Sequence, residues 1–184
     1  MKETYTIKVA GLERELKLFK VNDDLSIAAF ILFGDVELTE KCAKELVKKA
    51  PPHDIVFTAE CKSIPLVYEF CRQTGEKYII ARKGPKVYME DVVYTDAQSI
   101  TTANMQKLCI GKDDIEAMKG KRVLIMDDVI STGGSLNSLE YLVEQAGGTI
   151  VGKMTILAEG DAAERDDLIY LEKLPLFDGN GNQI

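Results

Sequence analysis

Short apolar runs alternate with segments of helical period along most of the chain. Four runs rich in aliphatic residues predict β-strands, at 55–57, 78–81, 122–126 and 150–157. Amphipathic segments around these runs, with charged residues between the apolar ones, predict α-helices at 38–49, 64–73 and 135–145. Nearly continuous apolar strands separated by helices are typical of a parallel sheet buried on both faces. The pattern therefore predicts an α/β fold, a parallel sheet flanked by helices.

The two regions outside this alternation predict smaller elements. Residues 5–9 and 16–19 alternate between polar and apolar side chains on either side of Gly11, which predicts a small N-terminal hairpin. Residues 87–94 and 105–110 predict a second hairpin around a flexible loop, because long weakly patterned stretches inside compact domains are often lids or binding loops.

The length of the chain fits one domain with a single sizeable core. It has 184 residues. We predict one domain over 1–184, with a hood or appendage at about 1–35, a core at 36–160 and a C-terminal segment at 161–184.

Composition and charge narrow the classes of function. The net charge is −7, from 23 basic and 30 acidic residues, which argues against a nucleic-acid-binding protein. No apolar run approaches the roughly 20 residues that span a membrane, and the first residues do not resemble a signal peptide. We therefore expect a cytoplasmic protein. The four cysteines lack zinc-site spacing and are expected to be free thiols, mainly in the core, and the single histidine, His53, is expected in a loop.

The segment most informative about chemistry follows the third predicted strand. Asp127 and Asp128 come at the end of that strand, and a glycine-containing loop then leads into a helix. In such a loop glycine lets the backbone approach an anion, and the helix start directs N–H groups at it. The two carboxylates suit ribose hydroxyls, or a magnesium ion reached through water or those hydroxyls. The predicted anion-binding residues are Ile130, Ser131, Thr132, Gly133, Gly134 and Ser135.

Other interpretations of this loop are weaker. A plain strand–turn–helix would explain Thr-Gly-Gly alone, but not two acids followed by Ser-Thr-Gly-Gly-Ser. The Gly-Lys-Ser/Thr of a Walker loop and the G-x-G-x-x-G of a dinucleotide fold are both absent. The loop is therefore predicted to bind a phosphate group, next to carboxylates that suit ribose hydroxyls.

The string VLIMDDVISTGGSL at 123–136 resembles the phosphoribosyl-pyrophosphate motif of type I phosphoribosyltransferases. Within that family it is most similar to the adenine phosphoribosyltransferases, and the resemblance extends more weakly over 38–159. The resemblance implies the type I phosphoribosyltransferase fold, with a hood and a mobile loop. Two motifs of the adenine enzymes are not intact: 23–27 only echoes the first and 94–99 replaces the second. The choice of base therefore stays open.

The resemblance also implies further site residues at the ends of other strands. A pyrophosphate loop follows the first predicted strand, and basic residues that help to bind pyrophosphate follow the second. Taken singly, each of these charged residues is also explained as solvated surface charge. Their order along successive strand ends favours a binding site. The implied residues are Glu60, Cys61, Lys62 and Ser63, then Arg82, Lys83 and Lys86, and Glu159 near the base pocket.

The implied function is transfer of ribose 5-phosphate from phosphoribosyl pyrophosphate to a purine base, adenine first, in purine salvage. Mg²⁺ is the expected cofactor and a homodimer the expected assembly, with Arg82 and Lys83 near the partner. Asp127 and Asp128 are the expected catalytic residues. The alternatives are a regulatory protein that binds phosphoribosyl pyrophosphate or a nucleotide without turnover, and an enzyme acting on xanthine, orotate or another base.

Overall fold

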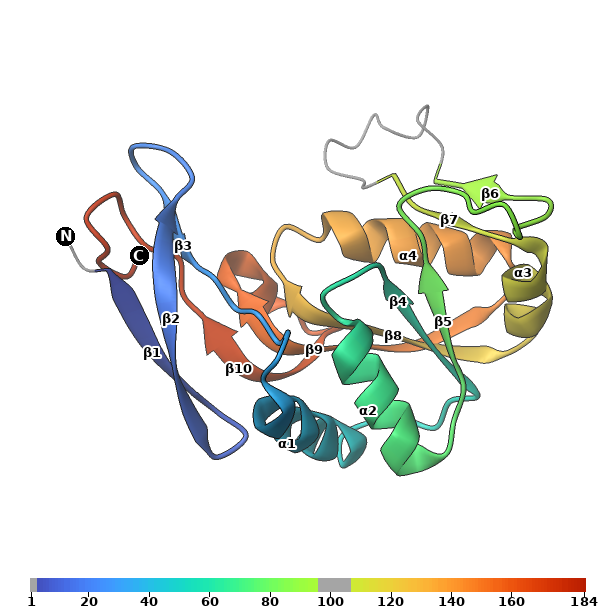
Figure 1. Cartoon of the computed structure of the whole chain (residues 1–184), viewed down its shortest axis with the longest axis horizontal. Coiled ribbons are helices and arrows are strands. Elements are labelled where there is room, and N and C mark those ends of the chain that lie inside the picture. The colour runs from blue at the N-terminus through green and yellow to red at the C-terminus, as the bar shows by residue number, and fades with distance from the viewer. Residues whose placement is uncertain (1–2, 96–106) are drawn as a thin grey trace.

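A five-stranded parallel sheet forms the centre of the computed structural model, which describes residues 3–95 and 107–184 (Figure 1). Its strand order is β10-β9-β8-β4-β5, and all its neighbours pair in parallel. The predicted fold class is confirmed. The strands are β4 (Ile55–Ala59), β5 (Tyr78–Ala81), β8 (Arg122–Ile130), β9 (Thr149–Glu159) and β10 (Ile169–Leu174).

Helices cover both faces of the sheet (Figure 1). The helices are α1 (Val36–Val47), α2 (Ile64–Thr74), α3 (Lys112–Met118) and α4 (Gly134–Gln145). Local signals set their ends: Asp35 accepts the Leu38 N–H at 3.1 Å at the start of α1, and Gly75 ends α2 with φ +79°.

Alternate residues of β8 serve two separate cores. Leu124 and Met126 pack with α1, α2 and the N-terminal strands, whereas Val123 and Ile125 pack with α4 and Met118 of α3. This alternation follows from the period of two in a strand, and it explains why the run reads as continuously apolar.

The N-terminal region forms a three-stranded antiparallel sheet, which we call the hood. Its strands are β1 (Thr4–Val9), β2 (Leu12–Lys20) and β3 (Ser26–Ala28). The predicted hairpin is confirmed as β1 and β2, and β3 was not predicted. Arg14 of β2 pairs with Asp35 at 2.6 Å, which ties the hood to the start of α1.

The C-terminal residues belong to both sheets. The segment after residue 160 begins with a 3₁₀ turn (Gly160–Glu164) and then supplies β10, an edge strand of the central sheet. Further on, Phe177 is fully buried and pairs with Ser26 of the hood. The expected boundary at 160 therefore does not separate the core from the C-terminal segment.

The region of weak pattern contains more structure than predicted. The short strands β6 (Val93–Tyr94) and β7 (Cys109–Ile110) pair as a hairpin, as expected, and α3 follows them without having been predicted. The part of the expected flexible loop at 96–106 lies outside the described residues.

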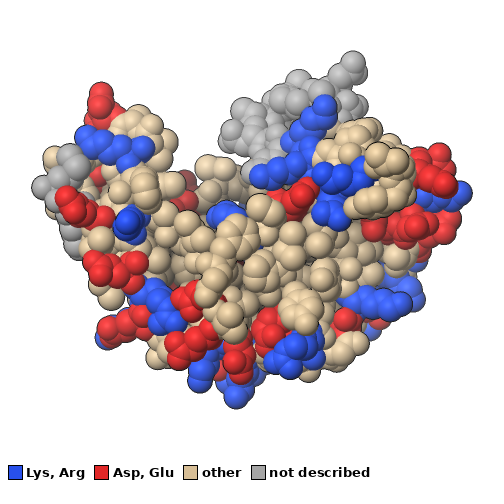
Figure 2. All heavy atoms as spheres, viewed as in Figure 1, with Lys and Arg blue, Asp and Glu red and all other residues tan. Residues whose placement is uncertain are grey.

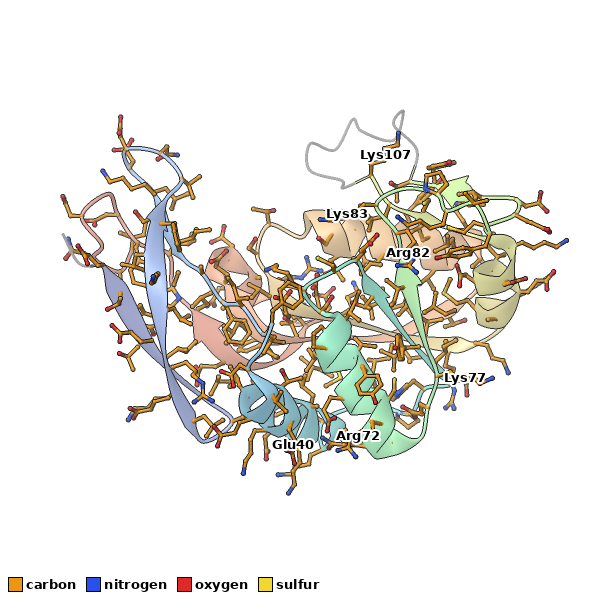
Figure 3. The ribbon with its side chains drawn as sticks, in the orientation of Figure 1. Glu40, Arg72, Lys77, Arg82, Lys83 and Lys107 are labelled. Carbon is orange, nitrogen blue, oxygen red and sulfur yellow. The ribbon has the colours of Figure 1, made fainter. Side chains whose placement is uncertain are left out.

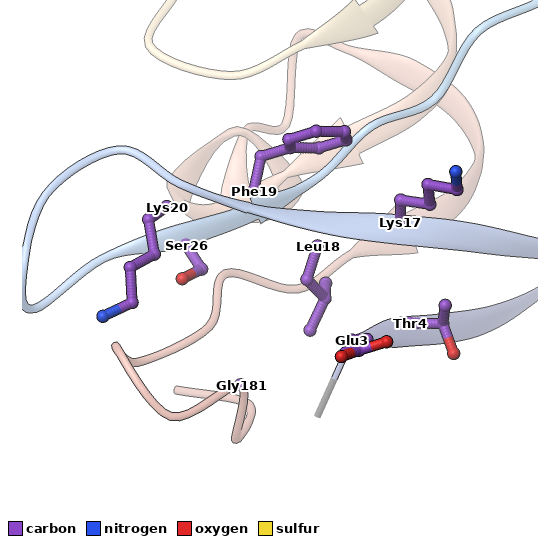
Figure 4. A pocket seen from close by; sticks show the side chains of 8 residues that line it. All are labelled: Glu3, Thr4, Lys17, Leu18, Phe19, Lys20, Ser26 and Gly181. Atoms are coloured by element: carbon purple, nitrogen blue, oxygen red, sulfur yellow. The ribbon is translucent and has the colours of Figure 1, made fainter. Parts of the chain in front are cut away.

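Two further observations concern membrane-spanning helices and the surface of the hood. No helix in the described ranges is long and apolar enough to cross a membrane. A hollow of about 310 Å³ opens on the hood, apart from the strand ends of the central sheet (Figure 4). Its lining consists of Glu3, Thr4, Lys17, Leu18, Phe19, Lys20, Ser26 and Gly181.

Candidate functional site

The parallel strands end at one edge of the central sheet, and the predicted site segments follow them there. Residues 60–63 follow β4, residues 82–83 follow β5, and residues 131–135 follow β8, while Glu159 is the last residue of β9. Open α/β sheets bind their ligands at this carboxyl edge.

A cleft of about 510 Å³ lies between this edge and the hood. Figure 2 shows the molecule hollowed between the hood and the body of the central sheet. The predicted residues that line it are Glu60, Cys61, Lys62, Ser63, Lys83, Asp127, Asp128, Ser131, Ser135 and Glu159. The cleft lining does not include the predicted residues Arg82, Lys86, Ile130, Thr132, Gly133 and Gly134.

The two acids of the motif lie inside β8 rather than after it, so the predicted end of this strand was wrong. The strand runs on to Ile130 because Asp127 and Val129 stay paired with Thr155 and Leu157 of β9. Both carboxyl groups are consequently buried in the floor of the cleft.

Asp128 carries the least satisfied polar atom of the cleft. It is 2% exposed, and its Oδ2 lies 3.2 Å from Lys62 Nζ, whose side chain is half exposed. Across the described part of the chain this Oδ2 accepts no hydrogen bond. Buried carboxylate oxygens normally have donors, so the atom is placed to accept a hydrogen bond from a ligand.

Burial shifts two acids of the cleft, Asp127 and Glu159, toward their neutral forms. The pKa of Asp127 is raised by burial and by the neighbouring Asp128 carboxylate. Burial also raises the pKa of Glu159, against the opposing effects of Lys62 and a hydrogen bond with Ser131. A ligand that brings hydroxyl donors or a cation would favour the ionised forms again.

The loop after β8 has the geometry of an anion site. Gly133 adopts φ +83°, in the left-handed region, and forms the N-cap of α4. Ser131 and Thr132 are exposed, and α4 directs the positive end of its dipole to the same place. Ile130 is 3% exposed and packs in the core on the α4 face, so its side chain serves packing rather than binding.

Glu60 joins the loops that follow β4 and β5. Its Oε2 accepts the Lys83 backbone N–H at 3.0 Å, and its Oε1 lies 3.8 Å from Arg82 Nη1. Arg82 also donates to the Tyr88 hydroxyl at 3.0 Å. Figure 3 labels Arg82 and Lys83 beyond the end of β5; of these two, Lys83 lines the cleft. The cations that face the cleft are therefore Lys62 and Lys83, while Lys86 is exposed outside it.

The cysteines are distributed as expected. Cys42, Cys71 and Cys109 are buried free thiols, and Cys61 is an exposed thiol in the cleft.

Sequence reasoning missed one wall of the cleft. Residues 27–31 of the hood, together with Val129 and Leu174, supply this largely apolar wall. The signal available was the apolar run Ile-Ala-Ala-Phe-Ile, but a three-residue strand is too short to be recognised by its period.

The fold and this cleft define an α/β protein that binds its ligand at the carboxyl edge of a parallel sheet. The family model described as the phosphoribosyl transferase domain matches residues 37–175. The orotate phosphoribosyltransferase of Caldanaerobacter subterraneus is 32% identical over 132 residues, which are 71% of this chain and 58% of that protein. A xanthine phosphoribosyltransferase of Bacillus cereus is 30% identical over 134 residues, 71% of this chain and 67% of that protein.

Solved structures show the same fold. The adenine phosphoribosyltransferase of Thermoanaerobacter pseudethanolicus superposes with a TM-score of 0.69 at 19% identity, over 86% of this chain and 95% of that one. The adenine enzyme of Trypanosoma brucei, in complex with AMP, pyrophosphate and ribose-5-phosphate, gives a TM-score of 0.64 at 16% identity, over 80% of this chain and 70% of that one. The chain belongs to the type I phosphoribosyltransferase family.

Proposed function

We propose that the protein transfers ribose 5-phosphate from phosphoribosyl pyrophosphate to a nitrogen of a purine base and releases pyrophosphate. One observation carries the proposal: a single cleft is lined by the buried pair Asp127–Asp128, by Ser131 and Ser135 of the loop that follows, and by Lys62 and Lys83. The cleft thus combines an anion loop, acceptors for sugar hydroxyls and cations for a second phosphate group.

Each part of the substrate has a partner in this arrangement. The loop 131–135 and the start of α4 anchor the 5′-phosphate. Asp127 and Asp128 accept the ribose hydroxyls, and the Asp128 Oδ2, which lies 3.2 Å from Lys62 Nζ, accepts no hydrogen bond within the described ranges. Lys62 and Lys83 receive the pyrophosphate.

The reaction breaks the bond between the anomeric carbon and a pyrophosphate oxygen and forms a bond from that carbon to the base nitrogen. Positive charge develops on the ribose and negative charge on the leaving group. The carboxylates of Asp127 and Asp128 lie where they stabilise the first, and Lys62 and Lys83 stabilise the second. The hood closes the opposite side of the cleft and limits the access of water, which would compete with the base.

Magnesium fits this site as an ion shared with the substrate. Within the described ranges no three His, Cys, Asp or Glu side chains gather as a ready-made ligand set. Mg²⁺ commonly binds through one or two carboxylates together with water and substrate phosphates, and Asp127 and Asp128 offer such carboxylates. When bound, the ion would neutralise charge on the pyrophosphate.

Adenine is the acceptor that we propose first. Glu159, which accepts hydrogen bonds when ionised, lines the same cleft as the apolar hood segment 27–31. An apolar wall suits a flat base, and the amino group of adenine is a donor for the carboxylate. Xanthine is the second candidate, because several curated relatives carry that name.

A pyrophosphate-release assay tests the proposal. The protein would be incubated with Mg²⁺ and phosphoribosyl pyrophosphate, and with adenine, guanine, hypoxanthine, xanthine or orotate in separate reactions. Release that requires a purine supports transfer and identifies the base. No release with any base, while calorimetry still detects binding of phosphoribosyl pyrophosphate, would refute the enzyme and favour a regulatory protein. Release with orotate alone would refute the purine assignment.

A further inference from the structure

Arg165 lies against the phosphate loop although it is far from that loop in the sequence. It follows the 3₁₀ turn Gly160–Glu164, and its Nη1 lies 3.8 Å from the position that a Cβ on Gly133 would take. Asn137 Oδ1 borders the same position at 3.7 Å. The two side chains therefore wall the outer side of the loop at the residue whose φ is +83°.

Asp167 fixes the orientation of this arginine. The Nε and Nη2 of Arg165 donate to the two oxygens of Asp167, both at 2.8 Å. The third nitrogen, Nη1, donates no hydrogen bond in the parts of the chain that the structure describes. A planar guanidinium held on one edge keeps its other edge in a defined direction, here toward Gly133.

The pair is part of a network that also holds α4. Lys153 of β9 lies 2.8 Å from Asp167 Oδ2 and pairs with Glu140 of α4 as well. Arg165 and Lys153 are two cations, and Asp167 and Glu140 are two anions, so the network is neutral. It connects the segment after the 3₁₀ turn to β9 and to the helix that begins at the phosphate loop.

The order of the strands places the network at one end of the cleft. The strand order places β9 and β10 on one side of β8, and β4 and β5 on the other. Arg165 therefore belongs to the 5′-phosphate side, whereas Lys62 and Lys83 follow strands on the opposite side. Although the network is neutral, the Nη1 edge of Arg165 is directed toward Gly133 and the Asp167 carboxylate pairs with the opposite edge, so the guanidinium adds positive potential at the loop.

We infer that Arg165 is a positioning residue for the 5′-phosphate: it supports Gly133 and adds positive potential to the loop without belonging to the pyrophosphate side. The inference rests on the proposed function, because it assumes that the loop 131–135 binds the sugar phosphate. It adds a residue to that site, together with a defined selectivity between two ligands.

Calorimetric titrations of the full chain with ribose 5-phosphate and with pyrophosphate, both with Mg²⁺, test this inference. Arg165→Gln is expected to weaken ribose 5-phosphate binding about fivefold to tenfold and to leave pyrophosphate binding within about twofold, because Arg165 lies on the other side of β8. Arg165→Lys keeps the charge without the planar fork. Its affinity for ribose 5-phosphate is therefore expected to lie between those of the wild type and Arg165→Gln. In the assay with phosphoribosyl pyrophosphate, Arg165→Gln should raise KM more than it lowers kcat.

Arg72→Gln is the matched control. Arg72 makes the same two-bond pair with Glu69, at 2.8 Å and 2.8 Å, on the face of α2 away from the cleft (Figure 3). This variant should bind both ligands like the wild type.

The remaining outcomes separate the two proposals. Unchanged ribose 5-phosphate binding in Arg165→Gln, or an equal loss for both ligands with a lower melting temperature, overturns the positioning role while leaving the proposed function intact. A wild-type protein that binds neither ligand overturns both.

Discussion

Replacing Asp128 by asparagine removes one charge from the floor of the cleft with little change in shape. In the ligand-free protein the Oδ2 of this residue accepts no hydrogen bond from the described residues and lies 3.2 Å from the half-exposed Lys62. Such a pair contributes little to stability because water screens the lysine. The variant is therefore expected to fold, with a melting temperature equal to or above that of the wild type, since burying the Asp128 charge is costly and the half-exposed Lys62 offsets this cost only in part.

The expected loss of activity follows from the ligand contact. A hydrogen bond from a ribose hydroxyl to a carboxylate contributes about 1.5–3 kcal/mol, whereas an amide oxygen accepts more weakly. Since each 1.4 kcal/mol is about a factor of ten, kcat/KM for phosphoribosyl pyrophosphate should fall about tenfold to hundredfold. The loss should increase if the carboxylate also holds Mg²⁺.

The assay measures pyrophosphate release while phosphoribosyl pyrophosphate is varied at saturating base. Asp114→Asn is the control, because Asp114 is half-buried outside the motif and accepts the Gly111 N–H at 3.1 Å, which an amide oxygen also accepts. Equal effects of the two substitutions, or an Asp128→Asn variant within about twofold of wild type, would refute the assignment of Asp128 to the ribose.

Three other substitutions test different parts of the structure. Gly133→Val should abolish ribose 5-phosphate binding in titrations, because valine does not tolerate φ +83°; retained affinity would contradict an anion loop at this position. Asp127→Asn should raise the melting temperature at neutral pH, because burial raises the pKa of Asp127 in the folded protein whereas the unfolded carboxyl ionises near pH 4. Wild-type stability then falls as pH rises above about 4. Melting temperatures measured from about pH 5 to 8 should fall less in the variant than in the wild type. A parallel dependence on pH in the two proteins would contradict a raised pKa for Asp127. Phe177→Ala should lower the free energy of unfolding in urea by about 3–5 kcal/mol, since the ring is fully buried against Tyr5, whereas the exposed Phe19→Ala should change it little; similar losses would argue against the tail as an anchor of the hood.

The hydrophobic pattern predicts the central sheet well where local and tertiary preferences agree. The strand at 78–81 has the predicted bounds, while β8 extends beyond its predicted end because pairing with β9 continues through two acids. An aspartate stops an apolar pattern, but it does not stop the backbone hydrogen bonds of a parallel strand.

The elements that the pattern missed are those without a conventional apolar face. Helix α3 buries only Met118 among its residues, so it shows no helical period. The edge strand β10 exposes Glu172 and Lys173 to solvent, and two consecutive charged residues are more typical of a loop than of a strand. Both elements are held by tertiary contacts rather than by their own amphipathicity.

The candidate site also has one part that local sequence predicts and another part that depends on tertiary contacts. The part of the cleft formed by residues 127–135 depends on the backbone conformation of a few consecutive residues, so glycine, serine and aspartate at fixed spacing are sufficient to indicate where it lies. The opposite wall is made by the hood, whose strand β3 pairs with Phe177 from the other end of the chain. Arg165 lies in a charged run that reads as solvated surface, and only the folded chain brings its guanidinium to Gly133. One half of the cleft is thus specified by local sequence, and the other half by packing between segments that lie far apart in the chain.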